Sequence, residues 1–240
     1  MRPPARALPP VTTALLIANV VIFFVPALLD NFGVQIFGER VSEVLFIFGA
    51  KINTAIAAGE IWRLFTATFL HASVIHIGFN GFALYSLGAD IERAYGPRRF
   101  AAVYLAGGLM GSLVSYLLQP NPSVGASGAI FGLMGALGVF FYRGRAVFGG
   151  ASQQVLASMI MTALINLGIG FSTPFIDNWG HIGGLIGGTL AALALAPNFV
   201  APRYGESERP VASWPTLGWP LVAGLIAITL VGGWLLPGAK

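Results

Sequence analysis

The sequence predicts an all-α membrane protein, a polytopic bundle of six core transmembrane helices with a seventh helix at the carboxyl end. Three observations carry this prediction. Only 9% of the 240 residues are charged, against about 25% in a typical soluble domain. Hydrophobic residues make up 56%, and 32 further residues are glycine, more apolar surface than a globule of this size hides from water. Runs without charge, each about 20 residues long or longer, recur along the chain, and this length crosses a hydrocarbon core.

Composition also excludes several classes of protein. The chain has no cysteine, which rules out a disulfide scaffold, a thiolate metal site and a cysteine nucleophile. The net charge of +4 is a weak indication of an anionic partner, because in a membrane protein basic residues report sidedness. We therefore expect no nucleic-acid partner, no cofactor and no metal.

The first charge-free run, residues 11–29, predicts the first span. No small-residue cleavage site follows it, so we expect a retained helix and not a signal peptide. The next loop, 30–63, contains the apolar stretch VLFIFGA, which is too short to span. This loop is expected to lie at, or dip into, the membrane surface.

The remaining spans follow in order. Residues 64–89 predict the second, and 100–142 predict the third and fourth, divided by the turn QPNPS at 119–123. Residues 146–176 and 178–202 predict the fifth and sixth. After a linker at 203–216, the run 210–239 contains a seventh helix at about 217–236. We expect 1–240 to form one domain, with its core at about 11–202.

Basic residues in the loops predict the orientation, because Lys and Arg are retained on the cytoplasmic side. With the amino terminus inside, nine basic residues are cytoplasmic and four are outside. The inside set is Arg2, Arg6, Arg93, Arg98, Arg99, Arg143, Arg145, Arg203 and Arg209, and the outside set is Arg40, Lys51, Arg63 and Lys240. The carboxyl terminus is then outside.

All three histidines, His71, His76 and His181, fall near the predicted outer ends of spans. A polar group in a membrane helix tends to face the bundle interior, which favours a functional site. His76 and Asn80 in HIGFN lie four residues apart, hence on one helix face. They can converge on one ligand atom, or serve only as hydrogen-bonding contacts between helices.

A candidate nucleophile lies in VGASGAIFG, at the start of the fourth span. Ser127 is flanked by Gly125 and Gly128, so backbone and hydroxyl are open to close approach. The first amides of a helix lack intrahelical partners and would stabilise a negative oxygen there. An exposed nucleophile beside free donors suits acyl transfer. A helix cap or a small packing residue is the alternative.

The sixth span opens with NWGHIGGLIGG. Glycines at four-residue intervals predict close packing against another helix. If that partner is the fourth span, which carries Gly128, Gly132 and Gly135, then His181 and Ser127 lie at similar depth. A base within reach of the serine would make it a competent nucleophile.

A third member of a triad is hard to find. Asp90 and Glu92 lie at the opposite face, and Asp177, four residues before His181, is more ordinary as a helix cap. The residues favour a Ser/His dyad, with Phe131, one helical turn from Ser127, as packing for the imidazole.

This combination resembles the rhomboid family of intramembrane serine proteases, in motifs that extend in order from about residue 60 to 190. The matching pieces are Trp62-Arg63, His71, HIGFN with His76 and Asn80, ERAYGPRRF from Glu92 to Phe100, GASG around Ser127 with its continuation GAIFGLMG, and the glycine-flanked His181.

The resemblance implies that Ser127 is the nucleophile and His181 the general base, without an aspartate. It implies an oxyanion hole made by His76, Asn80 and the backbone amide of Ser127. The seventh span resembles the six-plus-one arrangement seen in some members.

In the same way, the resemblance implies that His71 and Trp62-Arg63 organise the first loop and perform no chemistry. The implied partners are the lipid bilayer and transmembrane protein substrates with a small residue before the cleaved bond. From the short chain we expect a multi-pass protein of a prokaryotic plasma (inner) membrane, with its active site near the outer leaflet.

Two other functions remain open from the sequence. One is a small transporter whose His, Ser and Asn line a path, although these polar groups gather near the outer face and leave the inner half apolar. The other is a catalytically silent protein that binds membrane clients.

Overall fold

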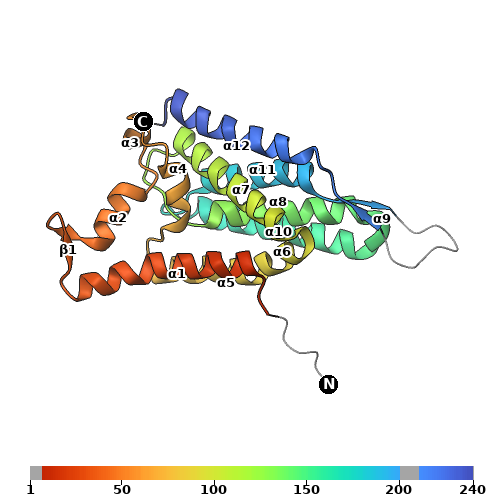
Figure 1. The fold of residues 1–240 in the computed structure, drawn as a ribbon, viewed down its shortest axis with the longest axis horizontal. Helices are drawn as coiled ribbons and strands as arrows, with labels where there is room; N and C mark the ends of the chain where they lie inside the picture. The colour runs from red at the N-terminus through yellow and green to blue at the C-terminus, as the bar shows by residue number, and fades with distance from the viewer. Residues whose placement is uncertain (1–6, 201–210, 240) are drawn as a thin grey trace, which may run out of the picture.

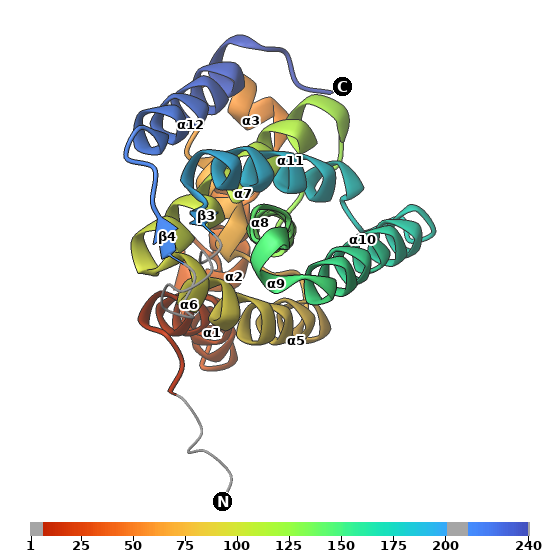
Figure 2. The same cartoon turned by 90° about the vertical axis from the view of Figure 1, so that its right-hand side faces the viewer.

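The computed structural model describes residues 7–200 and 211–239. Its long helices run roughly along the longest axis of the molecule (Figure 1), and a view down that axis shows them side by side (Figure 2). Several short helices and two short antiparallel strand pairs are the other regular elements among these residues. The predicted all-α class is confirmed.

The first helix, α1 (Pro10–Asn31), extends the predicted span by a residue or two at each end. Its amino terminus is fixed by Glu92 of α6 (Ala89–Tyr95), because the carboxylate accepts from the amides of Val11 and Thr12 at 2.9 and 2.7 Å. The Thr12 hydroxyl donates to the same group at 2.7 Å. A carboxylate on the first free amides of a helix satisfies them and complements the helix dipole.

The first loop folds into a hairpin, β1 (Gln35–Ile36) and β2 (Glu39–Arg40), followed by α2 (Val41–Gly49) and α3 (Asn53–Ala57). The apolar stretch that is too short to span forms α2, whose side chains at positions 45–48 are 37–55% exposed. Exposed apolar side chains on a short helix fit the expected position at a membrane surface.

The second predicted span is wrong as a single helix. Residues 63–69 form α4 (Arg63–Thr66) and the 3₁₀ turn η1 (Ala67–Phe69), bent by 92° from the helix that starts at Val74. That helix comprises α5 (Val74–Ala83), the π-helical turn η2 (Leu84–Gly88) and α6. Ser73 starts it, accepting from the amide of His76 at 3.2 Å. A charge-free run does not reveal such an internal cap.

Three helices form the centre of the bundle: α7 (Pro97–Leu118), α8 (Ser127–Arg143) and α11 (Asn178–Leu195). Glycines bring their backbones together. A Cβ at Gly184 would lie 2.0 Å from the carbonyl oxygen of Gly128, and one at Gly188 would lie 2.2 Å from Cα of Gly132. The predicted close pairing of the fourth and sixth spans is therefore confirmed, as is the division near 119–123.

The other helices surround this centre. The short α9 (Arg145–Phe148) leads to α10 (Gly150–Phe171), which stands at the edge of the bundle (Figure 2). Strand β3 (Asn198–Val200) pairs with β4 (Val211–Ser213), and α12 (Gly218–Leu235) packs on α7 and α11. The predicted linker 203–216 lies partly outside the described residues, and its last part forms β4 and the turn before α12.

Among the described residues, four helices are long and apolar enough to cross a membrane, namely α1, α7, α10 and α12, and there are five if the bent pair is one span. At 17 residues, α8 is apolar but shorter, and the glycine-rich α11 is not in this set. Both lie in the interior, where small residues replace lipid-facing side chains. The structure thus supports a helical membrane bundle, and the count of seven spans stays a prediction.

Candidate active site

Ser127 and His181 come from different helices and meet at the same end of the bundle. Ser127 is the first residue of α8, and His181 lies in the first turn of α11. Oγ of Ser127 lies 2.9 Å from Nε2 of His181, a hydrogen-bond distance. The glycine contacts between α8 and α11 set this distance, because a larger residue at Gly184 would separate the two helices.

The imidazole of His181 is held by stacking. Its ring lies parallel to that of Phe131, with 4.4 Å between centroids and 8° between planes. Its other nitrogen, Nδ1, has no hydrogen-bond partner in the part of the chain that the structure describes. Nε2 is the nitrogen that faces the serine, and within residues 7–200 and 211–239 no carboxylate bonds to Nδ1.

Asp177 has another role. One carboxylate oxygen accepts from the amide of Gly180 at 2.9 Å, which caps α11, and the other accepts from the hydroxyl of Ser115 on α7. This is the helix-cap role anticipated from the sequence. The bond to Ser115, 62 residues away, also ties the start of α11 to α7, and nothing in the sequence pattern indicated it.

A group of polar side chains surrounds Gly125, just before Ser127. The backbone of Gly125 has a φ of +131°, and a Cβ there would lie 2.7 Å from Nε2 of His76 and 3.6 Å from Nδ2 of Asn80. His76 and Asn80 thus converge beside the serine, as their spacing on α5 predicts. Gly125 is required both for the left-handed conformation and for the close approach.

Donors in this group have no acceptor. Nδ2 of Asn80 is buried and has no hydrogen-bond partner among the described residues, and the same holds for both ring nitrogens of His71. The rings of His71 and His76 contact edge to face, 5.2 Å between centroids. Buried polar groups are seldom left unpaired, and those that are call for an explanation such as a catalytic role. The first amides of α8, including that of Ser127, also lack partners within the helix.

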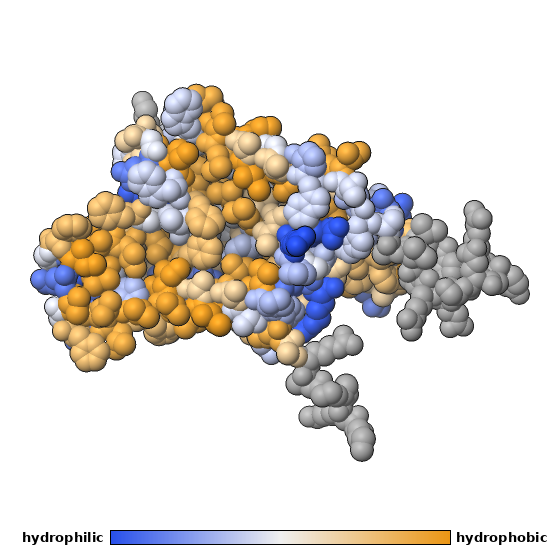
Figure 3. All heavy atoms as spheres, in the orientation of Figure 1, coloured by the Kyte–Doolittle hydropathy of each residue, from blue (hydrophilic) through white to orange (hydrophobic). Residues whose placement is uncertain are grey.

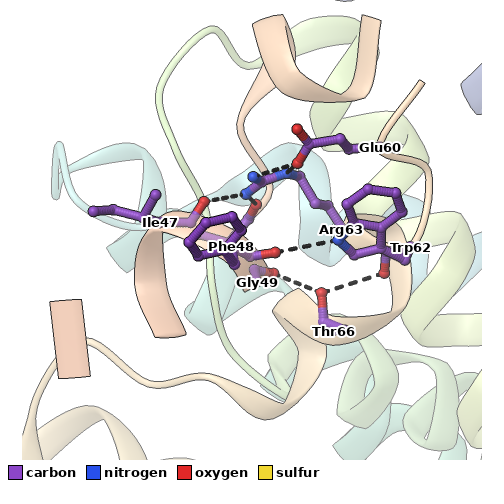
Figure 4. Close-up of polar contacts among 8 residues, drawn as sticks. Ile47, Phe48, Gly49, Glu60, Trp62, Arg63 and Thr66 are labelled. Atoms are coloured by element: carbon purple, nitrogen blue, oxygen red, sulfur yellow. Dashed lines mark hydrogen bonds and ion pairs between the residues drawn. The ribbon is translucent and has the colours of Figure 1, made fainter. Parts of the chain in front are cut away.

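Trp62 and Arg63 hold the first loop together (Figure 4). Arg63 is 3% exposed, and its guanidinium pairs with Glu60 and donates to the carbonyl oxygens of Ile47 and Ala50 at 2.6 and 3.0 Å. Trp62 donates from its indole to Phe48 at 3.2 Å. Neither residue approaches Ser127 through any of these contacts, so they tie α4 to α2.

Lys51 was not predicted to matter, yet it is 1% exposed. Its ammonium donates to the carbonyl oxygens of Gln119 and Asn121 at 2.8 and 2.7 Å and to Asn53 at 3.1 Å. Burial lowers the pKa of Lys51 to about 8, and Asp177 opposes this shift. The lysine thus joins the first loop to the α7–α8 loop that precedes Ser127. A lone lysine in an otherwise apolar stretch was the available signal.

A small cavity of about 30 Å³ lies beside Ser127, with Gly125, Gly128, Ser115 and Lys51 in its lining. This volume holds about two water molecules, and its polar lining supplies partners for them. Among residues 7–200 and 211–239, no cluster of three or more metal-ligating His, Asp or Glu side chains occurs. The arrangement offers a nucleophile, a base, unpaired donors and room for water.

Comparison with known proteins gives consistent matches. Residues 58–198 match the Rhomboid domain. The chain is 43% identical to "Rhomboid protease GluP" of Bacillus subtilis (strain 168) over 198 residues, 82% of this chain and 36% of the relative. It is 40% identical to "RHOMBOID-like protein 6, mitochondrial" of Arabidopsis thaliana over 154 residues, 64% of this chain and 48% of the relative. The chain thus spans between a third and a half of the length of these relatives.

Proposed function

Because this chain belongs to the rhomboid family, we propose that it is an intramembrane serine protease. It would hydrolyse peptide bonds in, or next to, the transmembrane helices of other membrane proteins. The observation that carries the proposal is the 2.9 Å contact between Oγ of Ser127 and Nε2 of His181. Nucleophilic catalysis by serine requires this contact with a base.

In the proposed reaction, Ser127 attacks the carbonyl carbon of the substrate while His181 accepts the hydroxyl proton. His181 then donates this proton to the leaving amine, and a peptide acyl group stays on Ser127. Water, activated by the same imidazole, releases the acyl group. Stacking on Phe131 would hold the ring in place through both steps, as a carboxylate does in a triad.

The tetrahedral intermediate carries a negative oxygen, which His76, Asn80 and the amide of Ser127 would stabilise. Support comes from the buried Nδ2 of Asn80, a donor without an acceptor, and from the close approach of His76 to Gly125. Donors fixed in advance around a developing charge need no reorganisation, and each contributes about 10²–10³ in rate. His71 would support His76 through the edge-to-face contact.

Substrates must offer an unwound segment, because a helix hides its carbonyls in its own hydrogen bonds. Helices with glycine or other weak helix formers unwind at the smallest cost. The cavity beside Ser127, of about 30 Å³, favours a small residue before the cleaved bond. It would also hold the hydrolytic water, and the segment 171–178 between α10 and α11 would cover it.

The orientation proposed from the basic residues places the amino terminus in the cytoplasm and the carboxyl terminus outside, in a prokaryotic plasma membrane. Ser127 would then lie near the outer leaflet. The tight anchoring of the first loop through Lys51 and Arg63 supports a role for this loop in shielding the site from lipid.

The test is cleavage of a tagged single-span reporter by purified protein in liposomes. We expect product from wild type, and none above background from Ser127→Ala or His181→Ala. Ser86→Ala is the matched control, since the hydroxyl of Ser86 bonds only within its own helix, to Phe82 and Ala83. Equal product from wild type and Ser127→Ala would remove the protease hypothesis.

The same experiment addresses the two other functions. A client-binding protein would retain the reporter without cutting it, and Ser127→Ala would not change retention. A transporter would show solute flux without product. Ser127, His181, His76 and Asn80 gather around Gly125 at one end of the bundle, which favours the protease over a transport path.

A further inference from the structure

A second, larger cavity lies between α1 and α7, behind η1. Its volume is about 250 Å³, and its lining is almost entirely apolar. Its lining includes Val11 and Leu15 of α1, Thr68 of η1, and Ala101, Leu105 and Gly108 of α7. None of the residues placed in the catalytic mechanism lines it.

An apolar cavity of this size excludes water and can accept an apolar occupant. Smaller cavities lined by aliphatic and aromatic groups stay dry and accept apolar molecules. A helix, with a diameter of about 10–12 Å, is too wide for the volume. Both bounding helices are long and apolar enough to cross a membrane, and the face over α1 and α7 is largely hydrophobic (Figure 3). Lipid chains are the apolar molecules that reach such a face.

A basic side chain, Arg98, lies on the face of α7 that lines the cavity. Arg98, Ala101, Leu105 and Gly108 follow the spacing that aligns residues along one side of α7. Arg98 is exposed and makes no hydrogen bond or ion pair with any residue the structure describes. In contrast, Arg99, the next residue, stacks over Trp214 with 4.2 Å to the ring centroid.

The length of the cavity also fits a lipid chain. The α7 residues that line the cavity, from Ala101 to Leu109, rise about 12 Å at 1.5 Å per residue, somewhat less than half of a hydrocarbon core some 30 Å thick. One acyl chain covers this depth in one leaflet. An arginine at the helix end extends to the headgroup level, where it meets phosphate.

We propose that the cavity between α1 and α7 binds one acyl chain of an anionic phospholipid, whose phosphate pairs with Arg98. The lipid fills a volume that no described side chain fills, and the arginine selects the headgroup. The site is distinct from the catalytic cavity but touches it, because Thr68 and Gly108 line both.

This shared wall gives the lipid a second effect, which rests on the proposed function. A Cβ on Gly108 would lie 3.0 Å from Cγ2 of Thr68, so the wall is thin. Next to Thr68, the carbonyl oxygen of Ala67 accepts from the amide of Gly125 at 2.9 Å. An occupied cavity would support η1 and thus the loop before Ser127, so we expect delipidation to lower cleavage.

The test measures binding without cleavage, so it stands apart from the proposed function. Purified protein is titrated with phosphatidylglycerol or phosphatidylcholine, and bound lipid is counted by native mass spectrometry. Leu105→Trp and, as a second variant, Ala101→Phe fill the cavity from α7. Leu164→Trp, on an exposed position of α10, is the matched control. Arg98→Gln is compared with Arg145→Gln on α9, because the Arg145 guanidinium lies over the ring of Tyr142.

We expect wild type to retain one phosphatidylglycerol per chain. The filling variants should lose affinity by about tenfold or more, since each methylene that they displace loses its favourable transfer from water. Arg98→Gln should weaken phosphatidylglycerol binding about fivefold without affecting phosphatidylcholine. The controls should stay within about twofold of wild type. Lipid retention that is unchanged in both filling variants, or an equal loss of retention in Leu164→Trp, would overturn the proposal. Phosphatidylglycerol binding that is unchanged in Arg98→Gln would also overturn it.

Discussion

The centre of the bundle and its edge are built in opposite ways. In the most hydrophobic 18-residue stretch of α7, 56% is buried inside the bundle. The glycines of α7 lie against the backbones of α8 and α11. In α10 the corresponding share is 6%, and its only buried residues are Ser152 and Gly170. At its end, α10 is held by Asn178, which donates to Leu167 at 3.0 Å.

This difference shows how the candidate dyad is positioned. Glycine costs helix propensity, about 1 kcal/mol per residue, but in lipid it permits the close backbone packing that drives helix association. In this chain such glycines lie where α8 meets α11, and this contact brings Ser127 to His181. A helix with few buried side chains, such as α10, opens at a lower free energy.

The largest effect is expected from exchanging glycines between the two regions. Gly184→Ala places a Cβ 2.0 Å from the carbonyl oxygen of Gly128, so α8 and α11 must move apart. We expect a loss of about 3 kcal/mol or more in the free energy of unfolding. Gly168→Ala on α10, with nothing within 4 Å, should be neutral or slightly stabilising. Melting temperatures of the two variants in detergent check this prediction. Similar values for both would contradict the proposed difference between the centre of the bundle and α10.

A second pair of glycine substitutions distinguishes the effect of backbone strain from the effect of disturbing the polar side chains beside Ser127. Gly125 and Gly59 both have positive φ, but only Gly125 lies against His76. Gly125→Ala should lower kcat/KM by about 10²–10³, the value of one lost oxyanion donor. Gly59→Ala should lower stability through strain and leave kcat/KM nearly unchanged. An equal loss of activity in both would mean that strain alone explains the effect.

The anchoring of the first loop gives the next prediction. Arg63→Lys keeps the charge but cannot reach Glu60, Ile47 and Ala50 together, because the planar fork of arginine is lost. We expect a loss of about 2 kcal/mol in the free energy of unfolding. Arg40→Lys, in an exposed pair with Glu43, should change stability by less than about 0.5 kcal/mol. Chemical denaturation of the two variants checks this. An unchanged free energy of unfolding in Arg63→Lys would show that other contacts hold the loop.

Lys51 gives the last prediction, an effect of pH on stability. Its pKa in the folded chain is about 8, against about 10.4 in an unfolded chain. Between these values the unfolded state binds a proton that the folded state lacks, so stability rises with pH from about 8 to 10, by about 1–3 kcal/mol. Melting temperatures across this range should show the rise in wild type and lose it in Lys51→Met. If the melting temperature of Lys51→Met still rises with pH, another titratable group causes the rise and the prediction is wrong.

The sequence predicts those parts of the fold that local composition determines. The bounds of α1, the break between α7 and α8, and the glycine contact of α8 with α11 follow from charge-free length, proline and small-residue spacing. The alignment of His76 with Asn80 follows from helix periodicity. Each of these signals is a pattern within one segment of the chain, even where, as with the glycines of α8 and α11, the contact that results joins distant segments.

The rest depends on distant partners. The 92° bend before α5 was missed because the run 64–89 has no charge to mark the break at 70–73. Lys51 was missed because its acceptors, Gln119 and Asn121, lie 68 and 70 residues away. The bond between Asp177 and Ser115 spans 62 residues. Such contacts are created by the packing of helices, and periodicity within one helix does not contain them.

The most direct test of the account is covalent labelling of the serine. Purified protein is treated with a fluorophosphonate, and the modified residue is identified by peptide mass mapping. The account predicts labelling of Ser127 in wild type and a loss of labelling in His181→Ala, because His181 must accept the hydroxyl proton. Labelling of Ser127 that is unchanged in His181→Ala, or label found only at other residues, would contradict it.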